Sequence, residues 1–210
     1  MLADELKGLD SAPGVSWSLQ RVELQEALRH ISDLPVILTT KNSWFWSLLG
    51  LLLGVLGQRR NFLDNMATTI GPVIAIPAGW ELPVAEIVSL HEIRHVQQYK
   101  WFGFGVSAWL GIPLFALLYL LLPLPLGLSY ARYRLELDAA IAQWDLCLYL
   151  GLWTTDQAKA QSAWFADVVA GPAYGWAWPR AWCKSRFAGE VELSTRAFLV
   201  EELSRGHLND

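Results

Sequence analysis

The chain has 210 residues, enough for one domain to bury a hydrophobic core without the help of disulfides. Its net charge is −4, and its sixteen Lys and Arg residues are scattered rather than gathered in a stripe, which excludes the electrostatic pattern of a nucleic-acid-binding protein. Hydrophobic residues make up 53 % of the chain and charged residues only 17 %, against roughly 25 % charged residues in a typical soluble domain. The composition therefore predicts either an unusually buried chain or one that contacts lipid or another protein.

The beginning of the chain and its cysteines bear on the cellular compartment. Asp4, Glu5 and Asp10 precede any apolar run, whereas a secretory signal has a basic segment followed by a hydrophobic one, so we expect no export by a signal peptide. Cys147 and Cys183 are far apart and form no C-x-x-C pair, which predicts two buried thiols rather than a disulfide framework or a thiolate zinc site.

The first half of the chain predicts two helices and two extended segments. Apolar residues recur at roughly helical spacing over residues 17–31, which indicates an amphipathic helix, and residues 35–40 are expected to be extended. Residues 42–57 are uncharged, but these 16 residues fall short of the roughly 20 needed for a straight membrane span, so we predict a buried or interfacial helix. Residues 68–77, TTIGPVIAIP, are rich in β-branched residues and predict a short strand. Because Pro72 has no amide hydrogen for a sheet ladder, this strand should begin there or lie at a sheet edge.

The last third of the chain predicts three helices. Residues 132–150 have a helical pattern, and Thr154 and Gln157 have capping-box spacing before a helix that ends near residue 171. Residues 171–180, GPAYGWAWPR, are expected to form a loop, and residues 190–205 a final helix. No repeat and no low-complexity linker divides the sequence, so we predict a single domain over residues 1–210.

The most informative motif is H-E-x-x-H, formed by His91, Glu92 and His95 within SLHEIRHVQQYKWFGFG. Histidines four residues apart on a helix project from one face and can share one metal ion. Pro83 suits the first turn of such a helix, and Val84, Ile87 and Val88 continue the stripe of the two histidines, so the imidazoles should point inward. Buried imidazoles need partners for their ring nitrogens, and a zinc ion supplies one to each.

A catalytic zinc site needs a third protein ligand. His30 and His207 lie near opposite ends of the chain, outside any motif, and are expected to be surface or capping residues. Glu136 lies beside an apolar stripe in ARYRLELDAAIAQW and is the better candidate, whereas Asp138 falls on the polar face with Arg134. The alternative for Glu136 is an ordinary solvated glutamate.

HEIRHVQQ followed by a helix with RLELDAA resembles the gluzincin group of zinc metallopeptidases, and in particular the membrane-bound prenyl-protein and stress-induced endopeptidases. The resemblance covers roughly residues 71–144. It implies a zincin-like α+β fold, mostly helical, with a small sheet whose edge strand precedes the motif helix. It implies zinc ligands at His91, His95 and Glu136 and a general base at Glu92. The edge strand, Val73, Ile74, Ala75 and Ile76, would hold an extended peptide substrate by β-augmentation.

One part of the family pattern is missing. Those endopeptidases usually carry an aspartate four residues after the glutamate ligand, and here that position is Ala140. No residue is an obvious stabiliser of the oxyanion either. Tyr174 and Arg180, in the expected loop at residues 171–180, are candidates beside the zinc ion itself.

The chain carries no charged residue from Trp101 to Ala131, a run that we expect to form an apolar helical insertion. Its prolines and glycines make it a poor straight membrane span, and a re-entrant hairpin would return Glu136 to the histidines. Lys100 and Arg132 on its flanks agree with the cytoplasmic side of a membrane. The insertion is therefore expected to contact a membrane, or else a hydrophobic protein partner or the interior of the domain.

Three functions are compatible with these features. The first is a membrane-associated zinc endopeptidase acting on a protein or peptide, in which Glu92 delivers water to the scissile carbonyl. The second is a catalytically silent, zincin-like structural subunit of a larger assembly such as a virion or a secretion apparatus. The third is a small integral membrane protein with a chance motif. The intact Glu92 favours the first function, while the missing aspartate keeps the second open.

Overall fold

The computed structural model of this protein is mostly helical with one small sheet, as the sequence predicts. Its residues group into two compact units, 1–116 and 117–210. The single domain expected from the sequence stays a prediction. The structure describes residues 24–30, 33–54, 59–121, 129–171 and 178–206.

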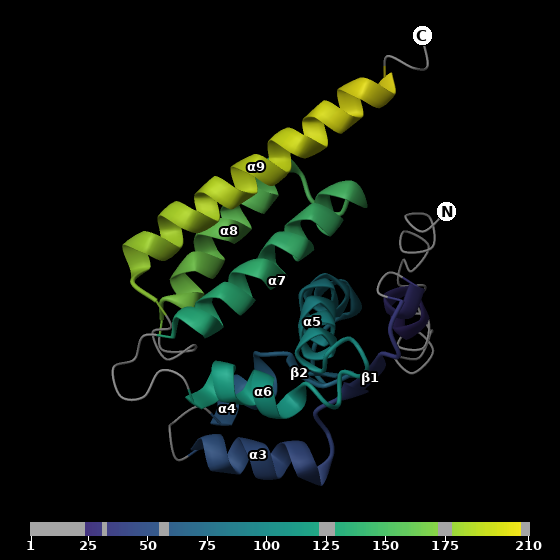
Figure 1. Ribbon diagram of the computed structural model, residues 1–210, viewed down its shortest axis with the longest axis vertical. Coiled ribbons are helices and arrows are strands. Elements are labelled where there is room, and N and C mark those ends of the chain that lie inside the picture. Colours follow the sequence, from purple (N-terminus) through teal and green to yellow (C-terminus); the bar gives the residue numbers. More distant parts are fainter. Residues whose placement is uncertain (1–23, 31–32, 55–58, 122–128, 172–177, 207–210) are drawn as a thin grey trace. The chain divides into compact units, whose positions relative to one another are not determined.

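A three-stranded mixed sheet lies in the first unit. Its strands, β1 (Ile37–Thr40), β2 (Thr68–Ile70) and β3 (Val73–Ile76), have the order β1-β3-β2 (Figure 1). β3 pairs in parallel with β1 and antiparallel with β2, and so it is the central strand. The prediction that Val73, Ile74, Ala75 and Ile76 form an edge strand is therefore wrong.

The turn between β2 and β3 explains this error. The segment that was expected to be one strand is a hairpin, whose two-residue turn is formed by Gly71 and Pro72. Gly71 has a φ of +58°, a conformation that glycine adopts without a steric penalty. Pro72 lies in the turn, where its missing amide hydrogen leaves no gap in the ladder. The proline therefore marks a change of direction, and the strand after it is free to pair on both sides.

The helices of the first unit are α3 (Trp44–Gly54), α4 (Arg59–Asp64), α5 (Leu82–Phe102) and α6 (Ile112–Ala116), and residues 24–30 are also helical. α3 buries Trp46 in a cluster with Phe62 of α4 and Ala75 of β3. Its Trp44 and Leu51 are exposed. The helix predicted near residues 42–57 is thus present, with one buried face.

The motif helix α5 begins as the sequence predicts, with Pro83 in its first turn, and Gly103 is its C-cap residue. His91 and His95 are buried, which confirms that the imidazoles point inward. Val84 is exposed, so the apolar stripe expected to begin there is wrong at its first position. Val84 lies in the first turn, and continuous burial of the helix starts five residues later, at Ser89.

The second unit contains a short π-helix, η1 (Leu117–Leu121), followed by α7 (Tyr130–Tyr149), α8 (Thr155–Val169) and α9 (Arg180–Gly206). The three long helices lie side by side (Figure 1) and share a core built around Trp144 and Phe187. Cys147 and Cys183 are buried, as expected, and burial raises the pKa of these thiols to about 12 and about 11.

The starts of α8 and α9 can be compared with the starts that the sequence predicts. The capping box of Thr154 and Gln157 is present, with both hydrogen bonds formed. The last helix, however, begins at Arg180, ten residues before the predicted start. Cys183, Phe187 and Val191, four residues apart, bury one face of this first part. The Gly, Pro and Trp residues just before Arg180 concealed this pattern.

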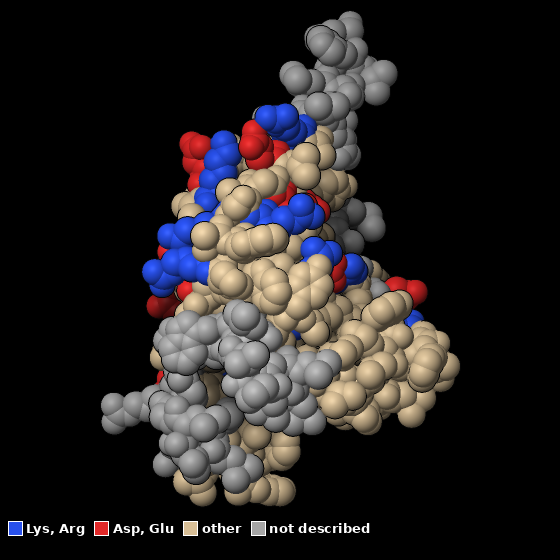
Figure 2. Space-filling model, turned by 60° about the vertical axis from the view of Figure 1, so that its left-hand side comes forward, with Lys and Arg blue, Asp and Glu red and all other residues tan. Residues whose placement is uncertain are grey.

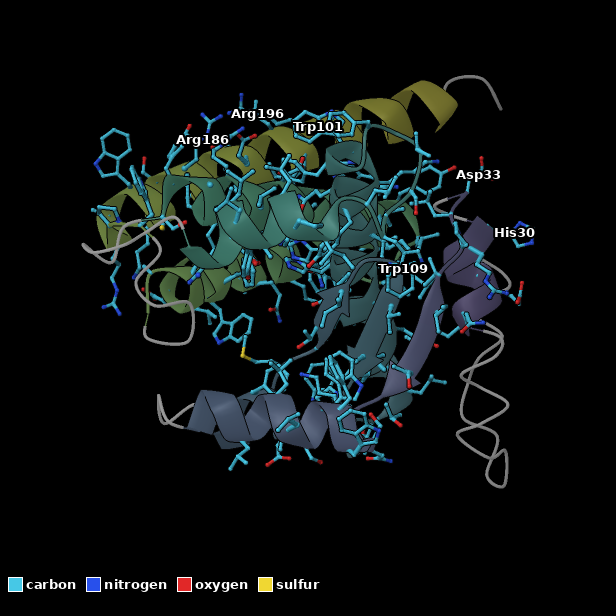
Figure 3. The ribbon with its side chains drawn as sticks, turned by 60° about the horizontal axis from the view of Figure 1, so that its bottom comes forward. His30, Asp33, Trp101, Trp109, Arg186 and Arg196 are labelled. Atoms are coloured by element: carbon cyan, nitrogen blue, oxygen red, sulfur yellow. The ribbon has the colours of Figure 1, made fainter. Side chains whose placement is uncertain are left out.

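The surface of the second unit is salt-bridged and polar. Arg180 and Lys184 both contact Asp167 at 3.1 Å, and Arg186 and Arg196 each pair with a glutamate four residues away on α9. Figure 2 shows Lys and Arg side chains intermixed with Asp and Glu side chains on the upper part of the face in view, and Figure 3 shows Arg186 and Arg196 projecting from α9. Such exposed pairs contribute little to stability and mark a solvated face.

The uncharged run from Trp101 onward does not form one long helix where it is described. α5 ends at Phe102, residues 103–111 form consecutive turns, and α6 and η1 follow. Among the described residues, none of the helices combines the length and apolarity that crossing a membrane would require.

The turn after α5 depends on the smallest possible side chain at Gly111. A Cβ atom at this position would lie 1.8 Å from the carbonyl oxygen of Tyr99 and 3.0 Å from the amide nitrogen of Gly103. We expect Gly111→Ala to lower the free energy of unfolding by about 3 kcal/mol, because the backbone itself must move. Urea unfolding followed by circular dichroism measures the change.

Gly79→Ala is the matched control, since a Cβ at Gly79 would meet no atom within 4 Å. A Gly111→Ala protein as stable as the Gly79→Ala protein would contradict this close packing.

Candidate metal centre

The motif histidines lie on one face of α5, as their spacing predicts. The ring centroids of His91 and His95 are 4.9 Å apart with an angle of 78° between the ring planes. Both side chains are buried, and the ring of Phe115 from α6 stands edge-on to His95 at 6.0 Å. The two imidazoles therefore lie close together, and the aromatic ring of Phe115 packs against one of them.

Gln98 fixes the orientation of the His95 ring. The Nδ1 atom of His95 lies 2.8 Å from Oε1 of Gln98, whose side chain is also buried. An amide oxygen accepts hydrogen bonds and does not donate them, so Nδ1 carries the hydrogen and Nε2 keeps its lone pair. A hydrogen bond of this kind from the outer nitrogen is the usual support of a metal-binding histidine.

Glu136 lies on α7 and is one of the most deeply buried residues of the chain, with 1 % of its surface exposed. The alternative of a solvated glutamate is therefore wrong. The hydroxyl of Tyr119, in η1, donates a short hydrogen bond to Oε1 of Glu136. Arg132 in turn donates from Nε to the carbonyl oxygen of Tyr119 at 2.7 Å and lies over the Tyr119 ring. The carboxylate thus has a defined partner within its own unit.

The structure brings together the three residues that the sequence proposes as ligands. The ligand atoms of His91, His95 and Glu136 all lie within 4.8 Å of one another, and all three side chains are buried. Ligands of a tetrahedral zinc ion stand about 2.0–2.1 Å from the metal and so roughly 3.3 Å from each other. The three side chains therefore form a group that could hold a metal ion.

Glu92 lies next to this group in sequence and is held in place by β2. The Oγ1 atom of Thr69 donates a hydrogen bond of 2.6 Å to Oε2 of Glu92. Tyr99, two turns further along α5, donates from its hydroxyl to the carbonyl oxygen of Thr69 at 3.2 Å. Hydrogen bonds therefore link strand β2 to the motif helix α5 at Glu92 and Tyr99.

Sequence reasoning missed a buried lysine near this carboxylate. Lys41 follows β1, and its Nζ atom donates hydrogen bonds to the carbonyl oxygens of Phe62 and Met66 and to Oγ1 of Thr68, at 2.6–2.7 Å. It also lies over the Phe62 ring, 3.8 Å from its centroid. Burial lowers the pKa of Lys41 to about 7, although the charge of Glu92 acts in the opposite direction. Nothing in TTKNS distinguishes this lysine from a surface residue that follows a strand.

Of the remaining candidates and histidines, those that the structure describes do not belong to this group. Tyr174 and His207 lie outside the described residues. Arg180 pairs with Asp167, and His30 is exposed, as expected, and points away from the chain (Figure 3). The strand Val73–Ile76 has neighbours on both sides, so it does not offer the free edge that was expected to bind substrate.

Compared with family models, curated proteins and solved structures, the chain matches none. The support for a metal centre is thus the arrangement of His91, His95 and Glu136 itself.

The lowered pKa of Lys41 predicts a pH dependence of stability. The folded state releases the lysine proton near pH 7 and the unfolded chain near pH 10.5, so folding is penalised at neutral pH and less so as the pH rises. Between pH 7 and 9 the free energy of unfolding of the wild type should rise by about 2 kcal/mol more than that of Lys41→Met. Urea unfolding at pH 7, 8 and 9 measures both slopes.

Lys41→Arg is the control, because a guanidinium stays charged over this range and should also lose the rise. Parallel pH profiles for the wild type and both variants would mean that Lys41 keeps its ordinary pKa.

Proposed function

We propose that this protein is a zinc-dependent endopeptidase of the gluzincin type, with a zincin-like arrangement of its helices and sheet. The observation that carries the proposal is the buried group of His91, His95 and Glu136, with Glu92 beside it in H-E-x-x-H order. Two imidazoles and one carboxylate are the protein ligands of catalytic zinc sites that keep a fourth position for water.

The surroundings of the ligands agree with this assignment. His95 presents Nε2 because Gln98 engages Nδ1, and the Tyr119 hydroxyl orients the Glu136 carboxylate. Among divalent metals, zinc suits a site with two imidazoles and one carboxylate in a buried place. When bound, the ion supplies a Lewis acid that polarises a carbonyl group and lowers the pKa of water.

Glu92 has the role of general base in this proposal. Its carboxylate takes a proton from the attacking water and passes it to the leaving amine of the peptide bond. Thr69 is the positioning residue, since its hydrogen bond to Oε2 holds one carboxylate oxygen and leaves the proton transfer to the other. Since Ala140 stands where related enzymes carry an aspartate, the support for the ligands here comes from Gln98 and Tyr119.

The substrate in this proposal is an extended protein or peptide segment. With β3 in the centre, the sheet has its edges at β1 and β2. β2 carries Thr69, the contact of Glu92, so a peptide paired along β2 would pass close to the general base. This replaces Val73–Ile76 as the proposed binding strand.

Metal content tests the ligand set. Purified wild type, reconstituted with zinc and dialysed, should hold about one zinc ion per chain by mass spectrometry. His95→Ala and Glu136→Gln should lose it, because each removes one of three protein ligands. His30→Ala, an exposed histidine outside the group, is the matched control and should retain the metal. A wild type that binds no zinc, or variants that bind it as well as the wild type, would refute the metal site.

Glu92→Gln separates an enzyme from a structural zinc protein. The amide keeps the shape and the hydrogen bond with Thr69 but cannot take a proton, so zinc should stay bound while cleavage of a protein substrate falls by about 100-fold or more. The readout is fluorescence release from labelled casein, with and without a chelator. Zinc retained in both proteins, with no cleavage by the zinc-loaded wild type, would instead support the catalytically silent structural subunit.

A further inference from the structure

A cluster of exposed apolar side chains lies on the turn that follows the motif helix. We call residues 101–110 the aromatic loop. Its members Trp101, Phe104, Val106, Trp109 and Leu110 are between 53 % and 90 % exposed, with Phe104 the most exposed. The indoles of Trp101 and Trp109 are labelled in Figure 3. Five large apolar side chains exposed within ten residues are an unusual concentration, and exposed apolar surface of this kind marks interaction sites.

The backbone of the aromatic loop holds Phe104 in a conformation that costs energy. Phe104 has a φ of +57°, in the left-handed region that non-glycine residues rarely occupy. The Phe104 ring is almost fully exposed, so packing of the ring in water does not compensate for this strained backbone conformation. Strain that persists at one exposed position is a sign of a functional constraint on that residue.

The loop is built rigidly rather than left to fluctuate. Gly111 packs against the backbone of Tyr99 and Gly103, where no Cβ could be accommodated, and a Cβ on Gly71 would touch the Trp109 ring at 3.2 Å. One face of Trp109 is thus fixed on the β2–β3 turn. The exposed apolar side chains of the loop therefore project from a closely packed backbone.

Six backbone amides in the loop and just after it have acceptors within the loop or at the end of α5. Backbone amides donate to acceptors at 2.9–3.3 Å from the following residues: Gly103, Phe104, Gly105, Val106, Trp109 and Ile112. An amide without a partner is costly in a membrane. These six amides would therefore not lose a hydrogen bond when the loop leaves water.

The charged residues next to the loop in the first unit have one sign. Residues 93–116 contain two basic residues, Arg94 and Lys100, and no aspartate or glutamate. Lys100 directly precedes Trp101 and is partly exposed. Basic residues beside an apolar tip complement the negative headgroups of anionic phospholipids.

From these observations we propose that the aromatic loop inserts into the interfacial region of an anionic phospholipid membrane, with Phe104 and Val106 deepest and the two tryptophans at the headgroups. Trp is enriched at this level of a bilayer because its ring is apolar and its N–H is polar. The insertion is shallow, which agrees with the finding that no described helix is suited to span a membrane. The proposal goes beyond the proposed peptidase function and does not depend on it.

Co-sedimentation of the full chain with large unilamellar vesicles tests the proposal. The wild type should bind vesicles of phosphatidylcholine with phosphatidylglycerol, and less tightly vesicles of phosphatidylcholine alone. Phe104→Gly should lower the partition coefficient by about tenfold, because it removes the most exposed ring. Its melting midpoint should not fall, because glycine adopts a positive φ freely. Weaker binding without a loss of stability separates insertion from unfolding.

A matched pair of tryptophans provides the control. Trp101→Ser should weaken vesicle binding at least fivefold, whereas Trp182→Ser should change it less than twofold, although Trp101 and Trp182 are similarly exposed at 72 % and 67 %. His95→Ala should bind vesicles like the wild type, so a failed metal site leaves this test intact. A wild type that binds neither vesicle, or equal losses in the two Ser variants, would overturn the proposal. So would an oligomer that Phe104→Gly dissociates in the absence of vesicle binding, since the loop would then contact a second copy of the chain.

Discussion

Burying the carboxylate of Glu136 removes a charged group from water, which is unfavourable unless other groups replace its hydration. The side chains around Glu136 provide such groups. An isolated buried carboxylate loses several kcal/mol or more of hydration, so it persists only where donors or a cation replace the water. Tyr119 supplies one donor, and His91 and His95 lie close enough to share a cation with it. Binding a divalent ion would compensate the charge that folding has buried. A metal ion bound here would account for the burial of all three groups together.

The same requirement extends to the next layer of side chains. Gln98 accepts from His95, Thr69 donates to Glu92, and Lys41 binds two carbonyl oxygens and the hydroxyl of Thr68. Tyr99 contributes a neutral hydroxyl, because burial and the charge of Glu92 raise its pKa far above the physiological range. Each of these polar groups is matched within the first unit, so the motif helix and the sheet are linked by directional contacts as well as by apolar packing.

The features that sequence reasoning recovered are those that depend on local spacing. The i, i+4 histidines, the capping box at Thr154 and the helical stripe beside Glu136 can each be read within a few residues. The misassigned features depend on contacts between distant segments. Whether β3 is central depends on its pairing with β1, more than thirty residues earlier, and no pattern within residues 68–77 contains that information. Lys41 escaped notice for the same reason, since its acceptors come from the α4 region and β2.

The π-helix η1 makes the support of Glu136 depend on the number of residues as well as on their identity. A π turn contains one residue more than an α turn, and each residue rotates an α-helix by about 100°. Tyr119 sits inside this widened turn, where its hydroxyl meets the carboxylate. Deleting one leucine from residues 117–121 would restore an ordinary turn and swing the phenol away, although every polar residue remained in the chain. The number of residues in this segment therefore determines whether Tyr119 reaches Glu136. A sequence alignment that treats a one-residue gap among these leucines as neutral would overlook this requirement.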